Sequence, residues 1–596
     1  MRNECGDMEM GLACASSFTS GEDPRFLTPK SKPQYTANRT FIPKHIALHL
    51  TVDVKKKTAH GRAETQYELF DNRKNIVLDA MQMKIDSIQV NGKKATFEYD
   101  GEKIIVPVRE KKGKVVVNYS VSKPELGIFF IHPTKDKPRK PYQAWTHSEP
   151  QEGRYWYPCQ DIPESKSPIE MHITVESPFI VIANGVKMGE KPSKEKKGWK
   201  TFSWSHNAEN STYLNSFAIG DFACVTDKWK HVNIEYYCQK GQEENISRSF
   251  GKTPQMMEFL SNYLRFPYPF KKYAQVAAAD FIFGGMEHTT CTTQSDWALQ
   301  DKIASTETPA RPTVLAIHEL THQWFGDIVT IKDWSHLYLH EGFATYFEYA
   351  WFEHEGGKDL YDYYRYVDLL EYMDVDKNLY RRPIVTNIYR EPNDLVDSGH
   401  VYSKAGLVIA HARDILGDEG FRDSLSEFIA KNAYNSVQTE HLVNAIRSTT
   451  GKNLTKFFDQ WVYNAGYPEL KVSVHYDAKK KVEHVRVVQM SKMDDKNLWD
   501  FPVTIALTTR NGKETFHCVE ISKREHRFAF PSSGEPSNVV FDHSNVVIKT
   551  LTMQKPRAMW LHQLKHDSKA IQRIYAAQEL AKIPSMEDVF AILNQF

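Results

Sequence analysis

The stretch that decides the fold is TVLAIHELTHQWFG, residues 313–326, in which two histidines and a glutamate follow the order HExxH. On an α-helix, residues four apart lie one turn above each other on the same face, so His318 and His322 can bind one cation. Pro312 and the apolar residues at helical spacing predict a helix of about three to four turns. The stretch therefore predicts a helix that carries two metal ligands.

A second segment supplies a candidate third ligand. Glu341 lies in HEGFATYFEYAW, residues 340–351, and eighteen residues separate it from His322. The segment from Leu337 to Trp351 is apolar on nearly every face, which predicts a buried helix. A glutamate buried there needs a compensating partner, and a metal ion provides one. A catalytic Zn²⁺ takes three protein ligands and keeps its fourth position open for water. His318, His322 and Glu341 therefore form a candidate set for one zinc ion.

Length, charge and cysteine content limit the classes of function. A chain of 596 residues is longer than a single core supports, so several domains are expected. Lys and Arg number 76 against 75 Asp and Glu, and the net charge of +1 favours neither nucleic acid nor an anionic membrane as a partner. The seven scattered cysteines and an N-terminus without a signal peptide predict a cytoplasmic location.

Hydrophobic periodicity divides this α+β chain into five segments. Residues 1–38 lack periodicity and predict a disordered leader, whereas residues 39–230 alternate apolar and polar side chains, as in an antiparallel β domain. Residues 231–468 follow a helical pattern and contain the HExxH helix. Residues 469–553 alternate again and predict a small β-sandwich. Residues 554–596 predict a short helical tail that is too small to be stable without docking on the rest.

Further motifs in the same chain order resemble those of the M1 family of zinc aminopeptidases, also called gluzincins. Residues 284–288, GGMEH, are similar to the family's GxMEN, and residues 461–468 match its WxxxxGYP pattern. The pattern TxxExxxxRxxxPCxD is matched by Thr146, Glu149, Arg154, Pro158, Cys159 and Asp161. The resemblance covers about residues 40–550 and implies a thermolysin-like α/β catalytic domain between the two β domains.

The resemblance and the residue types together assign two catalytic roles. Zinc lowers the pKa of its bound water to about 7, and Glu319, next to a ligand, is the candidate general base that takes the proton. Tyr402 lies in HVYSKAG, residues 400–406, which is similar to the family's YxKG stretch. Its hydroxyl is expected to donate a hydrogen bond to the oxyanion that develops during hydrolysis.

Two glutamates are the expected anchors of the substrate amine. A carboxylate of Glu287 or Glu149 at a fixed distance from the metal would pair with the α-ammonium group and measure one residue to the scissile bond. Gly284 and Gly285 would allow an extended substrate backbone to approach closely, and Met286 is expected to contact the first substrate side chain. The expected substrates are therefore peptides with a free N-terminus.

The sequence departs from the family pattern at three places. His288 replaces the asparagine of GxMEN, His147 replaces a glutamine often found before Glu149, and Ala405–Gly406 reverses the expected order after YxK. None of these changes removes a metal ligand, the base or an amine anchor. They bear on specificity and rate, and a histidine near a carboxylate would make binding respond to pH around 6 to 7.

Two other functions fit the same motifs. A non-catalytic scaffold with an M1-like fold would not require the intact zinc set, whereas an epoxide hydrolase like leukotriene A4 hydrolase would need a lipid-shaped pocket that no pattern identifies. Glu348, seven residues after Glu341, and Asp327 are open candidates for orienting a ligand, because each is equally explained as a buried acid bonded to backbone groups. The preferred first residue and the oligomeric state are not predicted.

Overall fold

The computed structural model describes residues 30–70, 74–490 and 498–582. Residues 1–29 of the predicted leader lie outside this range. Within it, β1 (Lys32–Pro33) pairs with β23 (Ile388–Tyr389), and the backbone N–H of Gln34 donates to the backbone carbonyl of Asn387 at 2.7 Å. Backbone hydrogen bonds hold residues 32–34 against the helical region. This part of the predicted disordered leader is therefore ordered.

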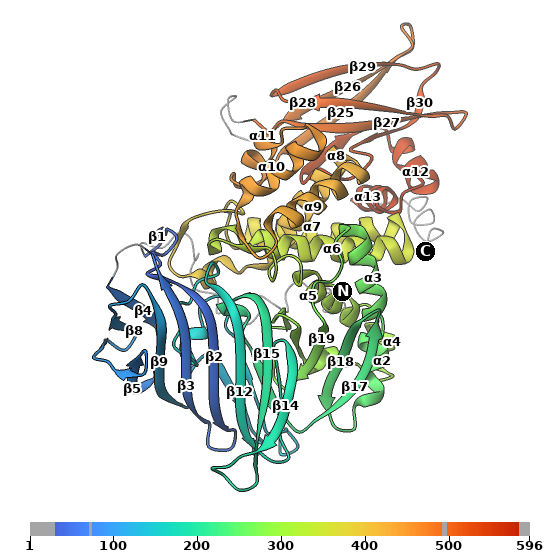
Figure 1. The fold of residues 1–596 in the computed structure, drawn as a ribbon. Helices are drawn as coiled ribbons and strands as arrows, with labels where there is room; N and C mark the ends of the chain where they lie inside the picture. The colour runs from blue at the N-terminus through green and yellow to red at the C-terminus, as the bar shows by residue number, and fades with distance from the viewer. Residues whose placement is uncertain (1–29, 71–73, 491–497, 583–596) are drawn as a thin grey trace.

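The N-terminal domain is built on an eight-stranded sheet in the order β14-β15-β12-β2-β3-β9-β5-β6 (Figure 1). Its strands are β2 (Phe41–Asp53), β3 (Thr58–Leu69), β5 (Lys84–Val90), β6 (Lys93–Lys94), β9 (Lys112–Ser122), β12 (Lys166–Glu176), β14 (Val186–Pro192) and β15 (Trp199–Ser211). Alternate residues of β2 are buried, as the period of two predicts. Neighbouring strands are antiparallel except β2 and β12, whose parallel pairing departs from the predicted antiparallel domain.

A four-stranded sheet of the same domain contains the strand that precedes Glu149. Its order is β10-β11-β16-β13, formed by β10 (Ile128–Ile131), β11 (Gln143–Thr146), β16 (Phe217–Gly220) and β13 (Ile180–Ala183). Strand β11 ends directly before His147 and Glu149, so the sheet fixes where this candidate amine anchor leaves the β domain. A small three-stranded sheet contains β4 (Asn75–Asp79), β8 (Lys103–Pro107) and β7 (Glu98–Tyr99).

The central domain begins with a five-stranded sheet in the order β17-β18-β19-β21-β20. Its strands are β17 (Phe222–Trp229), β18 (Val232–Gln239), β19 (Lys272–Ala278), β21 (Cys291–Ser295) and β20 (Gly285–Met286). Strands β18, β19 and β21 run parallel, and the outer strands β17 and β20 are antiparallel to their neighbours. Because β17 pairs with β18, this unit begins near Phe222, earlier than the boundary at residue 231 predicted from periodicity.

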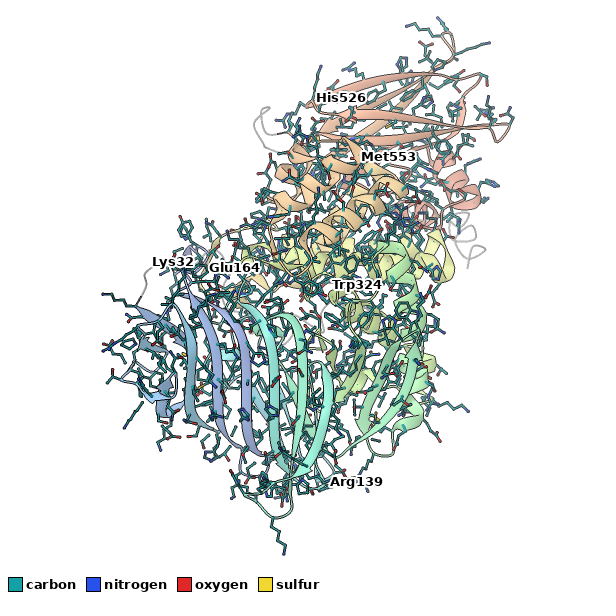
Figure 2. The ribbon with its side chains drawn as sticks, viewed as in Figure 1. Lys32, Arg139, Glu164, Trp324, His526 and Met553 are labelled. Carbon is teal, nitrogen blue, oxygen red and sulfur yellow. The ribbon has the colours of Figure 1, made fainter. Side chains whose placement is uncertain are left out.

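Helices form the rest of the central domain. They are α2 (Glu243–Phe250), α3 (Thr253–Leu264), α4 (Ala304–Glu307), α5 (Arg311–His322), α6 (Tyr338–Gly356), α7 (Lys358–Asn378), α8 (Ala405–Leu416), α9 (Asp418–Asn432), α10 (Thr439–Thr450) and α11 (Thr455–Trp461). Helix α5 packs on α6, which is buried from Tyr338 to Phe352 except at Glu348, as its apolar sequence predicts. Trp324, labelled in Figure 2, follows α5 and is fully buried, with its indole N–H bonded to the carbonyl of Phe266 at 3.1 Å.

The C-terminal part is a two-sheet β structure with two helices against it. One sheet has the order β29-β26-β25-β31 and the other β28-β27-β30. The elements are β25 (Glu469–Asp477), β26 (Val482–Gln489), β27 (Phe501–Thr509), β28 (Glu514–Ile521), β29 (Glu525–Pro531), β30 (Pro536–Phe541), β31 (Thr550–Gln554), α12 (Arg557–His566) and α13 (Ala570–Ala581). Helix α12 packs on β30, and α13 packs on α7, where Gln578 donates to the hydroxyl of Tyr366 at 2.5 Å. Among the described helices, none is both long and apolar enough to cross a membrane.

Candidate active site

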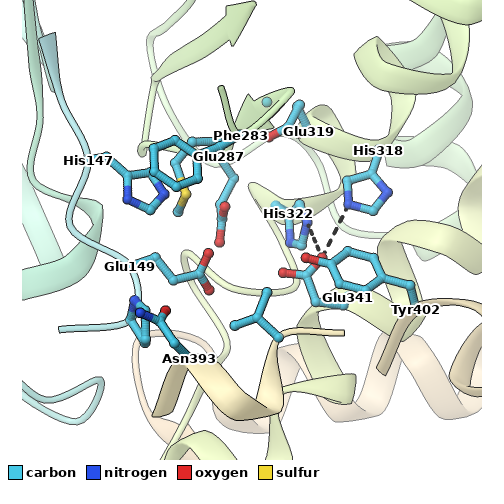
Figure 3. Close-up of a pocket in the computed structure, with 14 residues that line it drawn as sticks. His147, Glu149, Phe283, Glu287, His318, Glu319, His322, Glu341, Asn393 and Tyr402 are labelled. Carbon is cyan, nitrogen blue, oxygen red and sulfur yellow. Dashed lines mark hydrogen bonds and ion pairs between the residues drawn. The ribbon is translucent and has the colours of Figure 1, made fainter. Parts of the chain in front are cut away.

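Helices α5 and α6 bring the three predicted metal ligands together (Figure 3). His318 and His322 lie one turn apart on α5, and their Nε2 atoms are 3.2 Å and 3.3 Å from the same oxygen, Oε2 of Glu341. Neighbouring ligand atoms of a tetrahedral zinc ion lie about 3.3 Å apart, given metal–ligand distances of about 2.0 to 2.1 Å. The donor types and their spacing therefore fit a single ion of this size.

The other nitrogen of each imidazole has a partner that fixes the ring. Nδ1 of His318 lies 2.7 Å from Oε1 of Glu348, and Nδ1 of His322 lies 3.0 Å from the carbonyl oxygen of Phe325. Because both acceptors require a proton on Nδ1, the Nε2 lone pairs are left for a metal. Glu348 therefore lies where it could orient His318, one of the two interpretations that the sequence left open. No such contact is made by Asp327, whose buried carboxylate has no hydrogen-bond partner among the described residues.

The electrostatic field at the site favours a cation. Burial alone would raise the pKa of Glu341, yet the two adjacent imidazoles hold that pKa well below its usual value. Burial alone would lower the pKa of His322, but Glu287 and Glu341 raise it to about 10. Both shifts reflect the attraction between the Glu341 carboxylate and the adjacent imidazoles, to which Glu287 adds at His322. A divalent cation between these groups would relieve the same charge imbalance.

Glu319 lies between the two histidines in sequence and faces the cleft from α5. Burial raises its pKa to about 8, an effect that His318 and His322 partly oppose, and its Oε2 has no hydrogen-bond partner among the described residues. A Cβ atom added at Gly285 would overlap Oε1 of Glu319. This glycine therefore makes room for the candidate base, a role that the sequence did not reveal. Gly284 has a φ of +81°, which favours glycine there.

Glu287 and Glu149 approach the metal set from two different domains. Glu287 follows β20, where Tyr213 donates to its Oε1 at 3.4 Å and Gln323 donates to its backbone carbonyl at 3.0 Å. Glu149 follows β11, and its Oε1 has no hydrogen-bond partner among the described residues. In Figure 3 the two carboxylates face each other beside the histidines. Burial raises both pKa values, and Glu287 raises that of Glu149 further, so a cationic group between them would be stabilised.

Tyr402 comes from a π-helical turn, Ser398–Lys404, that leads into α8. Its ring stacks on His318 with centroids 5.9 Å apart and planes 17° apart, and it lies beside Glu341 in Figure 3. The carboxylate of Asp397 holds the start of the turn by accepting from the backbone N–H of His400 at 2.7 Å and pairing with Arg382. The turn thus places a neutral phenol next to the metal set.

Several residues that line the cleft were not predicted. They are Pro150, Phe283, Asn393 and Val396, and His147 joins them from the position where the family pattern has glutamine. His147 stacks on Phe283 with centroids 3.6 Å apart and planes at 4°. A flat aromatic wall of this kind carries no sequence signal, because its two rings come from distant segments. The cleft has a volume of about 30 Å³, room for about two water molecules, so only a narrow group fits beside the ligands.

His288 does not behave as the sequence suggested. Its side chain is fully buried away from the cleft lining, and its Nδ1 lies 3.0 Å from the hydroxyl of Thr293. Burial lowers the pKa of His288 well below its ordinary value, and the nearby His147 lowers it further. The lowered pKa of His288 argues against the expected response to pH around 6 to 7 at this residue.

Two family models match this chain. The peptidase M1 N-terminal domain matches residues 42–214, and the peptidase family M1 domain matches residues 248–461. These ranges include Glu149 in the first domain and the HExxH helix, Glu341 and Tyr402 in the second.

Curated relatives and a solved structure are similar to this chain over most of its length. Leucyl aminopeptidase of Saccharolobus solfataricus is 26% identical over 473 residues, which cover 79% of this chain and 59% of that protein. Aminopeptidase M1 of Arabidopsis thaliana is 25% identical over 506 residues, or 80% of this chain and 56% of the relative. The chain thus spans somewhat more than half the length of these relatives. The crystal structure of Legionella pneumophila aminopeptidase A in complex with aspartic acid has the same fold, with a TM-score of 0.81, 19% identity, and coverage of 92% of this chain and 64% of that one.

Proposed function

The chain belongs to peptidase family M1, and from this premise we propose that it is a zinc-dependent aminopeptidase that releases the N-terminal residue of peptides. The observation that carries the proposal is the pair of carboxylates, the half-buried Glu149 and the buried Glu287, beside the His318, His322 and Glu341 set. A metal set alone supports hydrolysis in general. The added pair of acids supports a substrate that ends in a free ammonium group.

The metal set and Glu319 account for hydrolysis. One zinc ion held by His318, His322 and Glu341 would provide a bound water whose pKa is lowered to about 7. The unpartnered Oε2 atom of Glu319 lines the same cleft and would accept a proton from the attacking water and return it to the departing amine. Its close fit against Gly285 restricts where this carboxylate can lie.

The two candidate amine anchors explain why cleavage would occur after the first residue of the substrate. An α-ammonium group between Glu149 and Glu287 would form charge-assisted hydrogen bonds with both carboxylates. Because these acids and the metal set line the same cleft, a peptide held by its amine would have its first peptide bond next to the reacting groups. Met286, in the same lining, would contact the first side chain together with His147 and Phe283.

Tyr402 accounts for the oxyanion, and a neighbouring cavity for the departing chain. The phenol can donate to the oxygen on which charge develops without adding charge to the ground state. A second cavity of about 30 Å³ shares Tyr402 and His318 with the cleft and is lined further by Trp297, Arg311, Val314, Leu315, Thr345, Glu348, Asp368 and Ser403. In this proposal it lies next to the path of the chain that leaves after cleavage.

The alternatives from the sequence gain no support. The complete metal set and the unpartnered oxygen of Glu319 argue against a non-catalytic scaffold. The two anionic anchors in the cleft argue against a lipid epoxide as the main substrate. A cytoplasmic location stays a prediction from the cysteine pattern, and the described cysteines, 159, 224, 238, 291 and 518, are free thiols.

The proposal is tested with leucine and alanine anilides, each with a free or an N-acetylated amine. We expect the zinc-loaded protein to hydrolyse only the free-amine forms, and a chelator to abolish turnover until zinc is restored. Hydrolysis of free and acetylated forms at equal rates would contradict the role of Glu149 and Glu287. No hydrolysis of either form by the zinc-loaded protein would contradict the aminopeptidase itself.

A further inference from the structure

A fully buried glutamine follows the second histidine of the HExxH motif. Gln323 is the C-terminal cap of α5, next to the candidate ligand His322, and its side chain is 0% exposed. It is not among the residues that line the cleft, and the proposed peptidase reaction gives it no role. A polar side chain in such a place is defined by the groups that it bonds.

The amide of Gln323 bonds in both directions to one turn of the chain, residues 287–290. Its Nε2 donates to the backbone carbonyl of Glu287 at 3.0 Å, and its Oε1 accepts from the backbone N–H of Thr290 at 2.9 Å. A carbonyl only accepts and a backbone N–H only donates, so these partners define the orientation of the amide. The side chain therefore joins both ends of the turn to the helix that carries two candidate metal ligands.

The turn needs such support because its backbone is strained. Thr290 has a φ of +62°, an uncommon left-handed conformation for a β-branched residue, which persists only where the surroundings enforce it. Asn184 donates to the carbonyl of Thr289 at 2.8 Å, and the N–H of Gly185 donates to the hydroxyl of Thr290 at 2.7 Å. Those two contacts come from the N-terminal domain. Of the contacts named, those of Gln323 alone link the turn to α5.

We propose that Gln323 is a positioning residue that sets the distance between the metal set and the amine anchor Glu287, a role that rests on the proposed aminopeptidase function. The hydrogen bond to its carbonyl makes the backbone of Glu287 move with α5. One substrate residue separates the ammonium group from the scissile bond, and a misplacement of about 1 Å costs about 100-fold in rate. Gln323 would thus act on the reaction through Glu287, without touching the substrate.

The test begins with Gln323→Met, which has a similar length but neither the donor nor the acceptor. Each unmet hydrogen bond to a buried group costs about 1 to 3 kcal/mol, which corresponds to a fall of about 10-fold or more in kcat/KM for leucine anilide. Zinc content should stay at the native level. In the Glu287→Gln background, Gln323→Met should have little further effect, because the anchor has already lost its charge.

Gln489→Met is the matched control. Gln489 is 1% exposed, donates to the carbonyl of Trp499 at 2.8 Å and accepts from the N–H of Trp499 at 3.2 Å. It lies on β26, and it does not line the cleft. Both variants should lower the Tm, but Gln489→Met should keep the native kcat/KM. Equal losses of kcat/KM in the two variants would show general destabilisation and overturn the proposal.

Gln323→Asn keeps the proposal testable if the methionine variant does not fold. Its amide is one methylene shorter and cannot hold both bonds at these distances, so kcat/KM should fall with zinc retained. Native kcat/KM in both Gln323 variants, loss of zinc, or effects that multiply with Glu287→Gln would each overturn the positioning role and leave the proposed peptidase intact. No turnover of free-amine anilides by the native zinc-loaded protein would overturn the proposed function, and this role with it.

Discussion

Gly285 lies against the carboxylate of Glu319, and its missing side chain leaves the space that this carboxylate occupies. The meeting of the candidate metal ligands His318, His322 and Glu341 could be predicted from the sequence because they belong to short motifs of defined spacing. The partner of His322 could not, because a backbone carbonyl such as that of Phe325 is present at every position. The orienting role of Glu348 required the packing of α5 on α6 to be known.

Replacing Gly285 by alanine should impair catalysis without removing the metal. The added methyl group would displace the Glu319 carboxylate, and displacement of a reacting group by about 1 Å costs about 100-fold in rate. We expect kcat/KM to fall by about this factor while zinc content, measured by elemental analysis, stays at the native level. An alanine variant with native activity would show that the carboxylate has space to move.

Replacing Glu287 by glutamine should weaken recognition of the amine specifically. The amide keeps the shape of the side chain but not its charge, and loss of one partner of a buried charged pair costs about 2 to 5 kcal/mol. For free-amine anilides we therefore expect kcat/KM to fall about 30-fold or more, with zinc retained. Glu355→Gln, at an acid on α6 outside the cleft, is the control and should leave kcat/KM unchanged. Native kinetics in the Glu287 variant would remove this residue from substrate binding.

At the scale of elements, the HExxH helix and the buried α6 could be predicted, but the π-helical turn around Tyr402 could not. A seven-residue segment is too short to distinguish the period of a π-helix from that of an α-helix. The groups that stabilise the turn also come from outside it, since Arg382 lies 15 residues before its partner Asp397. Tertiary contacts therefore determine this backbone geometry.

The π-helical turn should act on catalysis through Tyr402. Loss of one oxyanion donor costs about 100- to 1,000-fold in kcat, which is the effect expected for Tyr402→Phe. Asp397→Asn removes the charge that pairs with Arg382 and should lower kcat by displacing the phenol. In the Tyr402→Phe background, Asp397→Asn should have little further effect on kcat. Additive effects of the two changes would assign Asp397 a separate role.

At the scale of the whole molecule, the order of β, helical and β regions follows from periodicity, whereas strand pairing does not. The parallel contact of β2 with β12 joins segments that each alternate in the same way, so nothing local distinguishes it from an antiparallel one. The meeting of Glu149 with Glu287 likewise depends on how the N-terminal domain docks on the central sheet. The resemblance to the M1 family predicted that these two carboxylates lie near each other. The residue types alone gave no basis for that prediction.

The helical region and the β-sandwich should be coupled through two tryptophans. Trp461, at the end of α11, lies 4.6 Å from Trp499 between ring centroids, and both side chains are nearly fully buried. Trp499→Ala should lower the free energy of unfolding by about 3 to 5 kcal/mol, measured by denaturant titration. Phe516→Ala, at a side chain 55% exposed, should change it by less than about 0.5 kcal/mol. Equal effects would show that the tryptophan contact does not stabilise the junction.

The central claim is that the metal set acts one residue away from a bound amine. Mass spectrometry of a ten-residue peptide incubated with the zinc-loaded protein tests it most directly, because the masses report where each bond is cut. We predict a ladder of products that shorten from the N-terminus by one residue at a time, and no products when the N-terminus is acetylated. Internal fragments, or release of two residues at a time, would contradict the account.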